Sequence, residues 1–169
     1  GIYKDREWPL EMKKRAAMIT RMDRDVGRIL DLIAKLGLDQ DTIVMFASDN
    51  GSHDKSGSLK FFDSNRIRGG KQLTGHKRSL YEGGMRVPFV ARWPGRIKRG
   101  VTTSHLSAFW DILPTFCELA GVEPPPNTDG VSFVPTLTGN RDKQKQPEFL
   151  YWEMPYGGGW QAVRMGKWK

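Results

Sequence analysis

The stretch that decides the fold is Thr42-Ile43-Val44-Met45-Phe46-Ala47, which runs directly into Ser48-Asp49-Asn50-Gly51. The first six residues show no polar alternation and are rich in strand formers, which predicts a strand buried on both faces, as in a parallel sheet. Ligand sites of open α/β sheets lie beyond the carboxyl ends of strands. The sequence therefore predicts an α/β fold with chemistry at Asp49 and Asn50.

The segment before this strand predicts a long amphipathic helix. Pro9 suits a first helical position, and Gly37 suits a left-handed stop after about Leu36. A helix followed by a buried strand is half of a βαβ repeat, which favours a parallel sheet. Between Pro9 and Gly37, apolar residues recur at the spacing of one helix face: Met18, Met22, Val26, Ile29, Leu30 and Ile33.

Five further elements are expected downstream. Residues 87–93 predict a strand with its proline near the start, and residues 107–120 predict a helix that Gly121 ends. Residues 148–153 and 161–165 predict antiparallel strands joined through a glycine-rich turn, with a third strand starting at Trp168.

A proline-rich connection at residues 122–130 predicts a domain border. We therefore expect residues 1–122 to form part of a large α/β domain. Residues 123–169 are expected to form a small carboxy-terminal α+β subdomain with an antiparallel sheet.

Composition narrows the class of protein. The 169 residues are 38% hydrophobic, enough for an ordinary domain with a core. No apolar run approaches the roughly 20 residues of a membrane-spanning helix. Cys117 is the single cysteine, which excludes an internal disulfide and a cysteine-rich metal site.

The net charge of +8 is concentrated between residues 66 and 99, a segment that contains ten basic residues and one acid, Glu82. This segment is typical of a solvated basic face, of nucleic-acid binding or of contact with a small anionic substrate. Nucleic acid is the weakest of the three, because interleaved aromatics, a reading helix and a zinc module are lacking. The ten are Arg66, Arg68, Lys71, Lys77, Arg78, Arg86, Arg92, Arg96, Lys98 and Arg99.

The candidate chemistry lies before this basic segment, at residues 49–53, and within it, at residues 76–77. Asp49 and Asn50 offer oxygen donors that suit a hard cation such as Ca²⁺ or Mg²⁺, although a plain Asp-Asn-Gly turn is the alternative. Lys77 offers a compact positive charge for an anionic oxygen at a reacting centre, or belongs to a solvated loop. His53 and His76 are candidate acids, bases or substrate contacts.

The order of the motifs resembles the carboxy-terminal part of the formylglycine-dependent sulfatases, in the arylsulfatase A-like branch of the alkaline-phosphatase superfamily. The block from Lys77 through Tyr81-Glu82-Gly83-Gly84 is its most specific part. The remaining matches, in chain order, are residues 17–27, Ser48-Asp49-Asn50-Gly51, Arg92-Trp93-Pro94-Gly95, Asp111-Ile112-Leu113-Pro114-Thr115, Asp129-Gly130 and residues 163–169.

This resemblance implies a function. Asp49 and Asn50 match the calcium ligands of the family, and Lys77 matches a lysine that contacts the sulfate ester. His76 and His53 are candidate contacts to the leaving group or substrate. The implied partners are sulfated carbohydrates, glycosaminoglycans or aryl sulfates. The implied fold is an alkaline-phosphatase-like sandwich with a mostly parallel sheet, and family members are usually exported or lysosomal.

One departure from the family pattern limits what the chain is expected to do. The Cys-x-Pro-x-Arg or Ser-x-Pro-x-Arg motif, whose first residue becomes the formylglycine nucleophile, is not in the sequence, and Glu118 follows Cys117 instead. We expect the nucleophile and the remaining calcium ligands to lie upstream, so that this piece alone is inactive and binds calcium weakly. Phosphate or phosphonate ester hydrolysis and non-catalytic binding of acidic polysaccharide are the alternatives.

Overall fold

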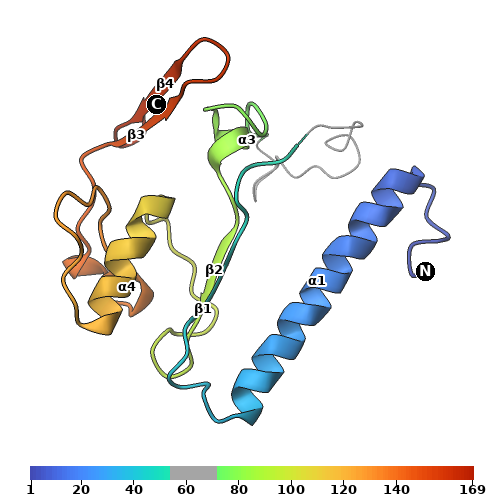
Figure 1. Ribbon diagram of the computed structural model, residues 1–169, viewed down its shortest axis with the longest axis horizontal. Coiled ribbons are helices and arrows are strands. Elements are labelled where there is room, and N and C mark those ends of the chain that lie inside the picture. Colours follow the sequence, from blue (N-terminus) through green and yellow to red (C-terminus); the bar gives the residue numbers. More distant parts are fainter. Residues whose placement is uncertain (54–71) are drawn as a thin grey trace. The chain divides into compact units, whose positions relative to one another are not determined.

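The computed structural model describes residues 1–53 and 72–169 (Figure 1). The chain divides into two compact units, Gly1–Val90 and Ala91–Lys169. This division does not test the domain border expected at residue 122, which stays a prediction. Three residues of the basic loop, Arg66, Arg68 and Lys71, lie outside the described residues.

The first unit opens with helix α1, Leu10–Lys35, which confirms the predicted amphipathic helix. Pro9 directly precedes it, where a missing amide proton costs nothing. The helix ends as predicted at Gly37, whose φ is 71°. The amide of Gly37 donates to Ala34 (3.0 Å) and that of Leu38 to Ile33 (3.0 Å), which is the Schellman pattern.

Strand β1, Val44–Ala47, pairs with strand β2, Phe89–Arg92, in a two-stranded sheet (Figure 1). Both strands were predicted, although each is shorter than its predicted range. The short helix α3, Glu82–Met85, precedes β2. Beyond β1 the amide of Ser48 donates to Pro88 (3.4 Å) and that of Gly51 to Gly84 (2.8 Å). Since one residue number rises as the other falls, the two segments run antiparallel.

The prediction that β1 is buried on both faces is wrong for this structure. Phe46 is 39% exposed, and the other three residues of the strand are half-buried. Within the residues the structure describes, β1 has one neighbouring strand, so neither a parallel pair nor a second flanking strand adds to its burial. The apolar residues of β1 are therefore only partly buried by the described part of this chain.

The second unit has a short 3₁₀ turn, η2, at Phe109–Asp111 that leads into helix α4, Ile112–Ala120. Helix α4 ends at Gly121, whose φ is 69°, which confirms the predicted helix and its stop. Cys117 is a half-buried free thiol. The short helix α5, Val134–Leu137, and the 3₁₀ turn η3, Arg141–Lys143, follow.

A buried polar group connects α4 to the segment before α5. The carboxylate of Asp111, 2% exposed, accepts from the amides of Ala108 (2.7 Å) and Val131 (2.8 Å). Thr115, fully buried, donates its hydroxyl to the carbonyl of Asp111 (2.6 Å) and accepts from the amide of Phe133 (3.1 Å). Because these buried polar groups are paired, the connection between residues 129–133 and α4 is fixed.

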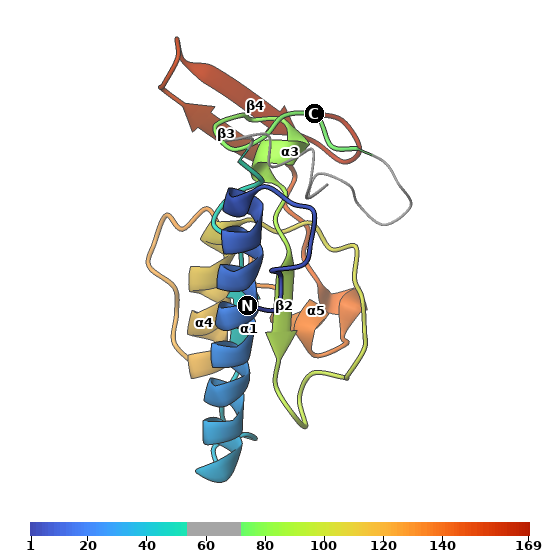
Figure 2. The same ribbon diagram turned by 90° about the vertical axis from the view of Figure 1, so that its right-hand side faces the viewer.

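The chain closes with a hairpin of strands β3, Leu150–Met154, and β4, Trp160–Arg164 (Figure 2). The strands are antiparallel, with Trp152 opposite Ala162, as predicted. The expected third strand is a single bridge between Met165 and Trp168. None of the helices in the described parts of the chain is long and apolar enough to cross a membrane.

Candidate functional site

The Asp-Asn-Gly turn lies directly after strand β1. Ser48 donates its hydroxyl to the carbonyl of Asn50 (3.0 Å), and the side-chain amide nitrogen of Asn50 donates to the carbonyl of Gly51 (3.1 Å). Asp49 is exposed and Asn50 is half-buried. Because the turn engages the amide nitrogen of Asn50, its oxygen and the carboxylate of Asp49 are the groups suited to bind a cation.

Glycines hold this turn against helix α3 through direct backbone contact. The amide of Gly51 donates to the carbonyl of Gly84 (2.8 Å), and the amide of Gly83 donates to that of Thr74 (2.7 Å). All three glycines are buried. A Cβ on Gly51 would collide with the carbonyl of Gly83, and a Cβ on Gly83 would collide with that of Gly75. Only glycine permits this approach of three backbone segments.

Lys77 is joined to the same turn. Its amide donates to the carbonyl of Ser52 (2.7 Å), three residues after Asp49, and its side chain is half-buried. The backbone reverses around it, since Gly75 has φ 81° and Arg78 has φ 73°. Such a left-handed conformation is unusual for arginine and costs roughly 1 kcal/mol. The loop therefore keeps an unfavourable conformation next to the predicted sulfate contact.

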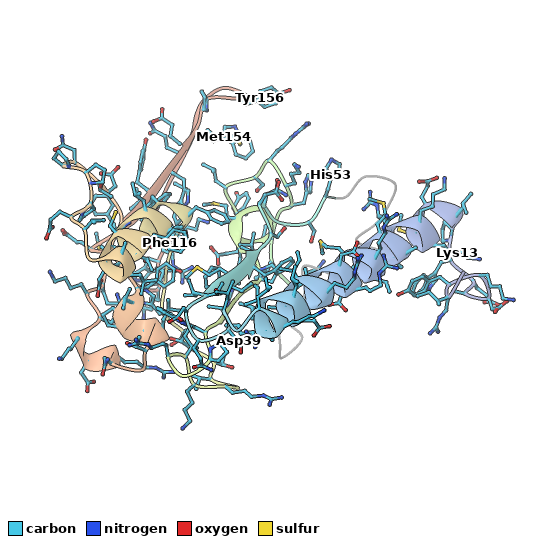
Figure 3. The ribbon with its side chains drawn as sticks, turned by 60° about the horizontal axis from the view of Figure 1, so that its bottom comes forward. Lys13, Asp39, His53, Phe116, Met154 and Tyr156 are labelled. Carbon is cyan, nitrogen blue, oxygen red and sulfur yellow. The ribbon has the colours of Figure 1, made fainter. Side chains whose placement is uncertain are left out.

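The two predicted histidines are chain neighbours of the residues that form the Lys77–Ser52 hydrogen bond. Nδ1 of His76 lies 2.9 Å from the carbonyl oxygen of Lys77, and the side chain is exposed. A carbonyl only accepts, so Nδ1 carries the proton and Nε2 is the atom that can accept one. His53 is exposed and follows Ser52 directly (Figure 3). The structure thus brings the backbones of residues 49–53 and 76–77 together.

The two oxygen donors suit a hard cation, but they are too few to complete its coordination. Asp49 and Asn50 contribute one carboxylate and one amide oxygen, whereas calcium takes about six to eight oxygens. Among residues 1–53 and 72–169, no group of three or more His, Cys, Asp or Glu side chains could hold a metal ion. A calcium ion held here needs further ligands, and the ligand roles of Asp49 and Asn50 stay predictions.

Several contributors to this site were not identified from the sequence. The close approach of Gly83 to the backbones of Gly51 and Gly75 was not predicted. The left-handed conformation of Arg78 was also missed. The glycines of the Asp-Asn-Gly and Glu-Gly-Gly motifs were the available signal for the close backbone contact. The sequence has no marker for the left-handed conformation of Arg78.

Comparison with known proteins defines the class. A family model described as Sulfatase matches residues 3–122, which is more than half of the chain. The chain belongs to the sulfatase family.

Individual relatives agree with this assignment. N-acetylgalactosamine-6-sulfatase of Mus musculus is 34% identical over 153 residues, which is 89% of this chain and 27% of that protein. Arylsulfatase A of Homo sapiens is 39% identical over 154 residues, which is 89% of this chain and 29% of that protein. The chain thus spans less than a third of the length of these relatives.

Solved structures show the same relationship. The crystal structure of Ps i-CgsB matches with a TM-score of 0.79 and 28% identity, covering 98% of this chain and 35% of that one. A structure described as a complex with its substrate D-Glucosamine-2-N, 6-O-disulfate matches with a TM-score of 0.65 and 28% identity, covering 87% of this chain and 28% of that one. The fold of this chain is therefore that of part of a sulfatase.

Proposed function

We propose that this chain is the carboxy-terminal part of a sulfate monoester hydrolase and supplies the cationic side of its active site. The observation that carries the proposal is the 2.7 Å hydrogen bond from the amide of Lys77 to the carbonyl of Ser52. It holds the lysine-bearing loop against the Asp-Asn-Gly turn. One ammonium group and two oxygen donors for a cation therefore belong to adjoining backbone segments.

The chemistry of sulfate ester hydrolysis requires this kind of charge. Cleavage of the ester leaves negative charge on the departing oxygen, and a fixed ammonium such as Lys77 stabilises that charge. Asp49 and Asn50 would hold calcium, which supplies further positive charge beside the sulfate group. Nε2 of His76 and the ring of His53 are candidates for moving a proton at the leaving group or for contacting substrate. A formylglycine outside this chain would supply the nucleophile.

The relatives support a proposal for the substrate class. Those named above are sulfatases of N-acetylgalactosamine 6-sulfate and aryl sulfates by their names, and one structural neighbour is described with a disulfated glucosamine. We propose a sulfated sugar or glycosaminoglycan as the natural substrate and export from the cytoplasm as the setting. We also propose that the complete protein has a larger, mostly parallel sheet that includes β1.

The test uses the complete enzyme that contains this chain and an aryl sulfate. Replacing Lys77 with Ala should lower kcat/KM by roughly 10²–10³, the usual cost of removing one stabiliser of developing charge. Lys98→Ala changes an exposed lysine of the same basic segment and should leave kcat/KM unchanged. Equal losses in both variants would mean that the charge of the segment matters and Lys77 has no special role.

Two further measurements separate the alternatives. An aryl phosphate turned over faster than the aryl sulfate would favour the phosphate-ester reading. Unchanged turnover in the Lys77 variant, combined with lost polysaccharide retention after changes at Arg66, Arg68 and Lys71, would favour a non-catalytic binding module. The purified 169-residue chain is expected to show no turnover of aryl sulfate at all.

A further inference from the structure

The two faces of the β3–β4 hairpin differ in their surroundings. On one face Leu150 is 2% exposed, and the ring of Trp152 lies 5.7 Å from that of Trp110, so this face packs on its own unit. On the other face Tyr151 and Val163 are paired across the strands and are 40% and 46% exposed. The hairpin is thus anchored along one side and open to solvent along the other.

The tip of the hairpin presents two aromatic rings around a segment without side chains. Tyr156, labelled in Figure 3, is 74% exposed, and Trp160 is 46% exposed. Between them, residues 157–159 are glycines with φ values of 76°, 106° and 76°. The indole of Trp160 donates to the carbonyl of Gly157 (3.2 Å), which fixes the orientation of its ring. Open space surrounds the Cβ positions of Gly158 and Gly159, so a ligand can approach the backbone there.

Two lysines follow strand β4. Nζ of Lys167 lies 5.1 Å from the ring centre of Trp168, and Nζ of Lys169 lies 5.1 Å from that of Trp152. Residues 150–169 contain a single acid, Glu153, and three basic residues. The carboxylate of Glu153 accepts the hydroxyl of Tyr151 (3.1 Å). An anionic partner therefore meets little repulsion along this hairpin.

We propose that this hairpin is a binding surface for a sulfated polysaccharide, separate in its residues from the hydrolytic site. The apolar C–H faces of sugar rings stack on Tyr156 and Trp160, because the face of an aromatic ring is its electronegative side. Sulfate groups further along the polymer pair with Lys167 and Lys169. Lys167 is separated from Trp160 by the length of β4, whose five residues span about 17 Å, so the ligand is a polymer and a single sulfated sugar is too short. Lysines are depleted at the cores of protein interfaces, which argues against a protein partner.

The test measures binding of the full 169-residue chain to fluorescein-labelled dextran sulfate by fluorescence anisotropy, with no dependence on turnover. The double variant Tyr156→Ala/Trp160→Ala should weaken binding by roughly tenfold, since each ring contributes a modest stacking energy. Its binding to polyphosphate, which carries charge without sugar rings, should not change. The double variant Lys167→Gln/Lys169→Gln should weaken binding to both polymers and reduce its salt dependence.

Phe116→Ala is the matched control, because Phe116 is also 46% exposed and lies in the same unit on α4 (Figure 3). It should bind dextran sulfate like the parent chain, and glucose 6-sulfate should compete only weakly. Unchanged dextran sulfate affinity in the aromatic double variant overturns the proposal and leaves a protein partner as the better reading. An equal loss in Phe116→Ala, or a parallel loss on polyphosphate, overturns it as well. The basic loop is intact in every variant, so its own contribution cancels.

Discussion

At the scale of single residues, the close approach of glycine backbones makes a sharp stability prediction. A methyl group at residue 83 would meet the carbonyls of Gly75 and Thr74, so Gly83→Ala must displace main chain. We expect it to lower the free energy of unfolding by about 1–3 kcal/mol, as overpacking usually does. Urea unfolding of the 169-residue chain measures this change.

Gly27→Ala is the control for the change at Gly83. Gly27 lies inside α1 and has no atom within 4 Å of its Cβ position. Alanine there should raise the free energy of unfolding by about 0.5–1 kcal/mol, because it restricts the unfolded chain and favours helix. If both alanines had the same effect, steric contact at Gly83 would not be the cause.

His105 makes a pH prediction at the same scale. Burial lowers the pKa of His105, while the negative charge of Asp111 and a hydrogen bond with Gln146 (3.2 Å) raise it to a smaller extent. As the pH falls, the unfolded chain therefore binds a proton on His105 at a higher pH than the folded chain does, near pH 6.5. The contribution of the neutral His105 ring to the free energy of unfolding is therefore complete above about pH 6.5, and it is lost as the pH falls below that value.

Replacing His105 with Gln should flatten the dependence of unfolding free energy on pH below about pH 6.5. Urea unfolding at a series of pH values checks this expectation. A variant with the same slope as the parent chain would assign the acid sensitivity to other groups.

At the scale of elements, Gly37 tests how α1 ends. Its φ of 71° is left-handed, and no atom lies within 4 Å of its Cβ position. Gly37→Ala should therefore cost about 1 kcal/mol through backbone conformation alone. The helical signal in circular dichroism should change little, while the urea midpoint falls. A larger loss would reveal packing at this position.

The buried link between α4 and residues 129–133 is a second test of an element. Asp111→Asn retains the shape but replaces one carboxylate oxygen with a donor that faces a backbone amide. We expect a loss of about 1–3 kcal/mol, the cost of a buried unpaired polar group. Asp142→Asn, on the exposed turn η3, should stay within about 0.5 kcal/mol of the parent in the same urea assay.

Local patterns in the sequence were sufficient to predict α1, its stop at Gly37 and the β3–β4 hairpin. Each of these depends on residues close together along the chain, such as periodic apolar positions and glycines at turns. The contact of Gly51 with Gly83 and the hydrogen bond between Asp111 and Val131 join distant residues, so no local period encodes them. Burial of β1 was overestimated because burial depends on neighbouring elements, which a strand's own composition does not specify.

At the scale of the whole molecule, the chain alone should be a poor calcium binder. Asp49 and Asn50 offer two oxygens, and calcium requires several more. Isothermal titration of the 169-residue chain with calcium should give no site tighter than about 1 mM. A site in the micromolar range that disappears in Asp49→Asn would show that the chain carries a complete ligand set.

The interlocked glycines also affect how enzymes of this family can be recombined. Because Gly51 contacts Gly83, and Gly83 contacts Gly75, main chain meets main chain without a side chain that could adjust. A chimera that takes residues 48–52 from one parent and residues 74–86 from another joins two backbones that never adapted to each other. Crossover points placed outside this pair of segments should yield folded hybrids far more often than points placed between them.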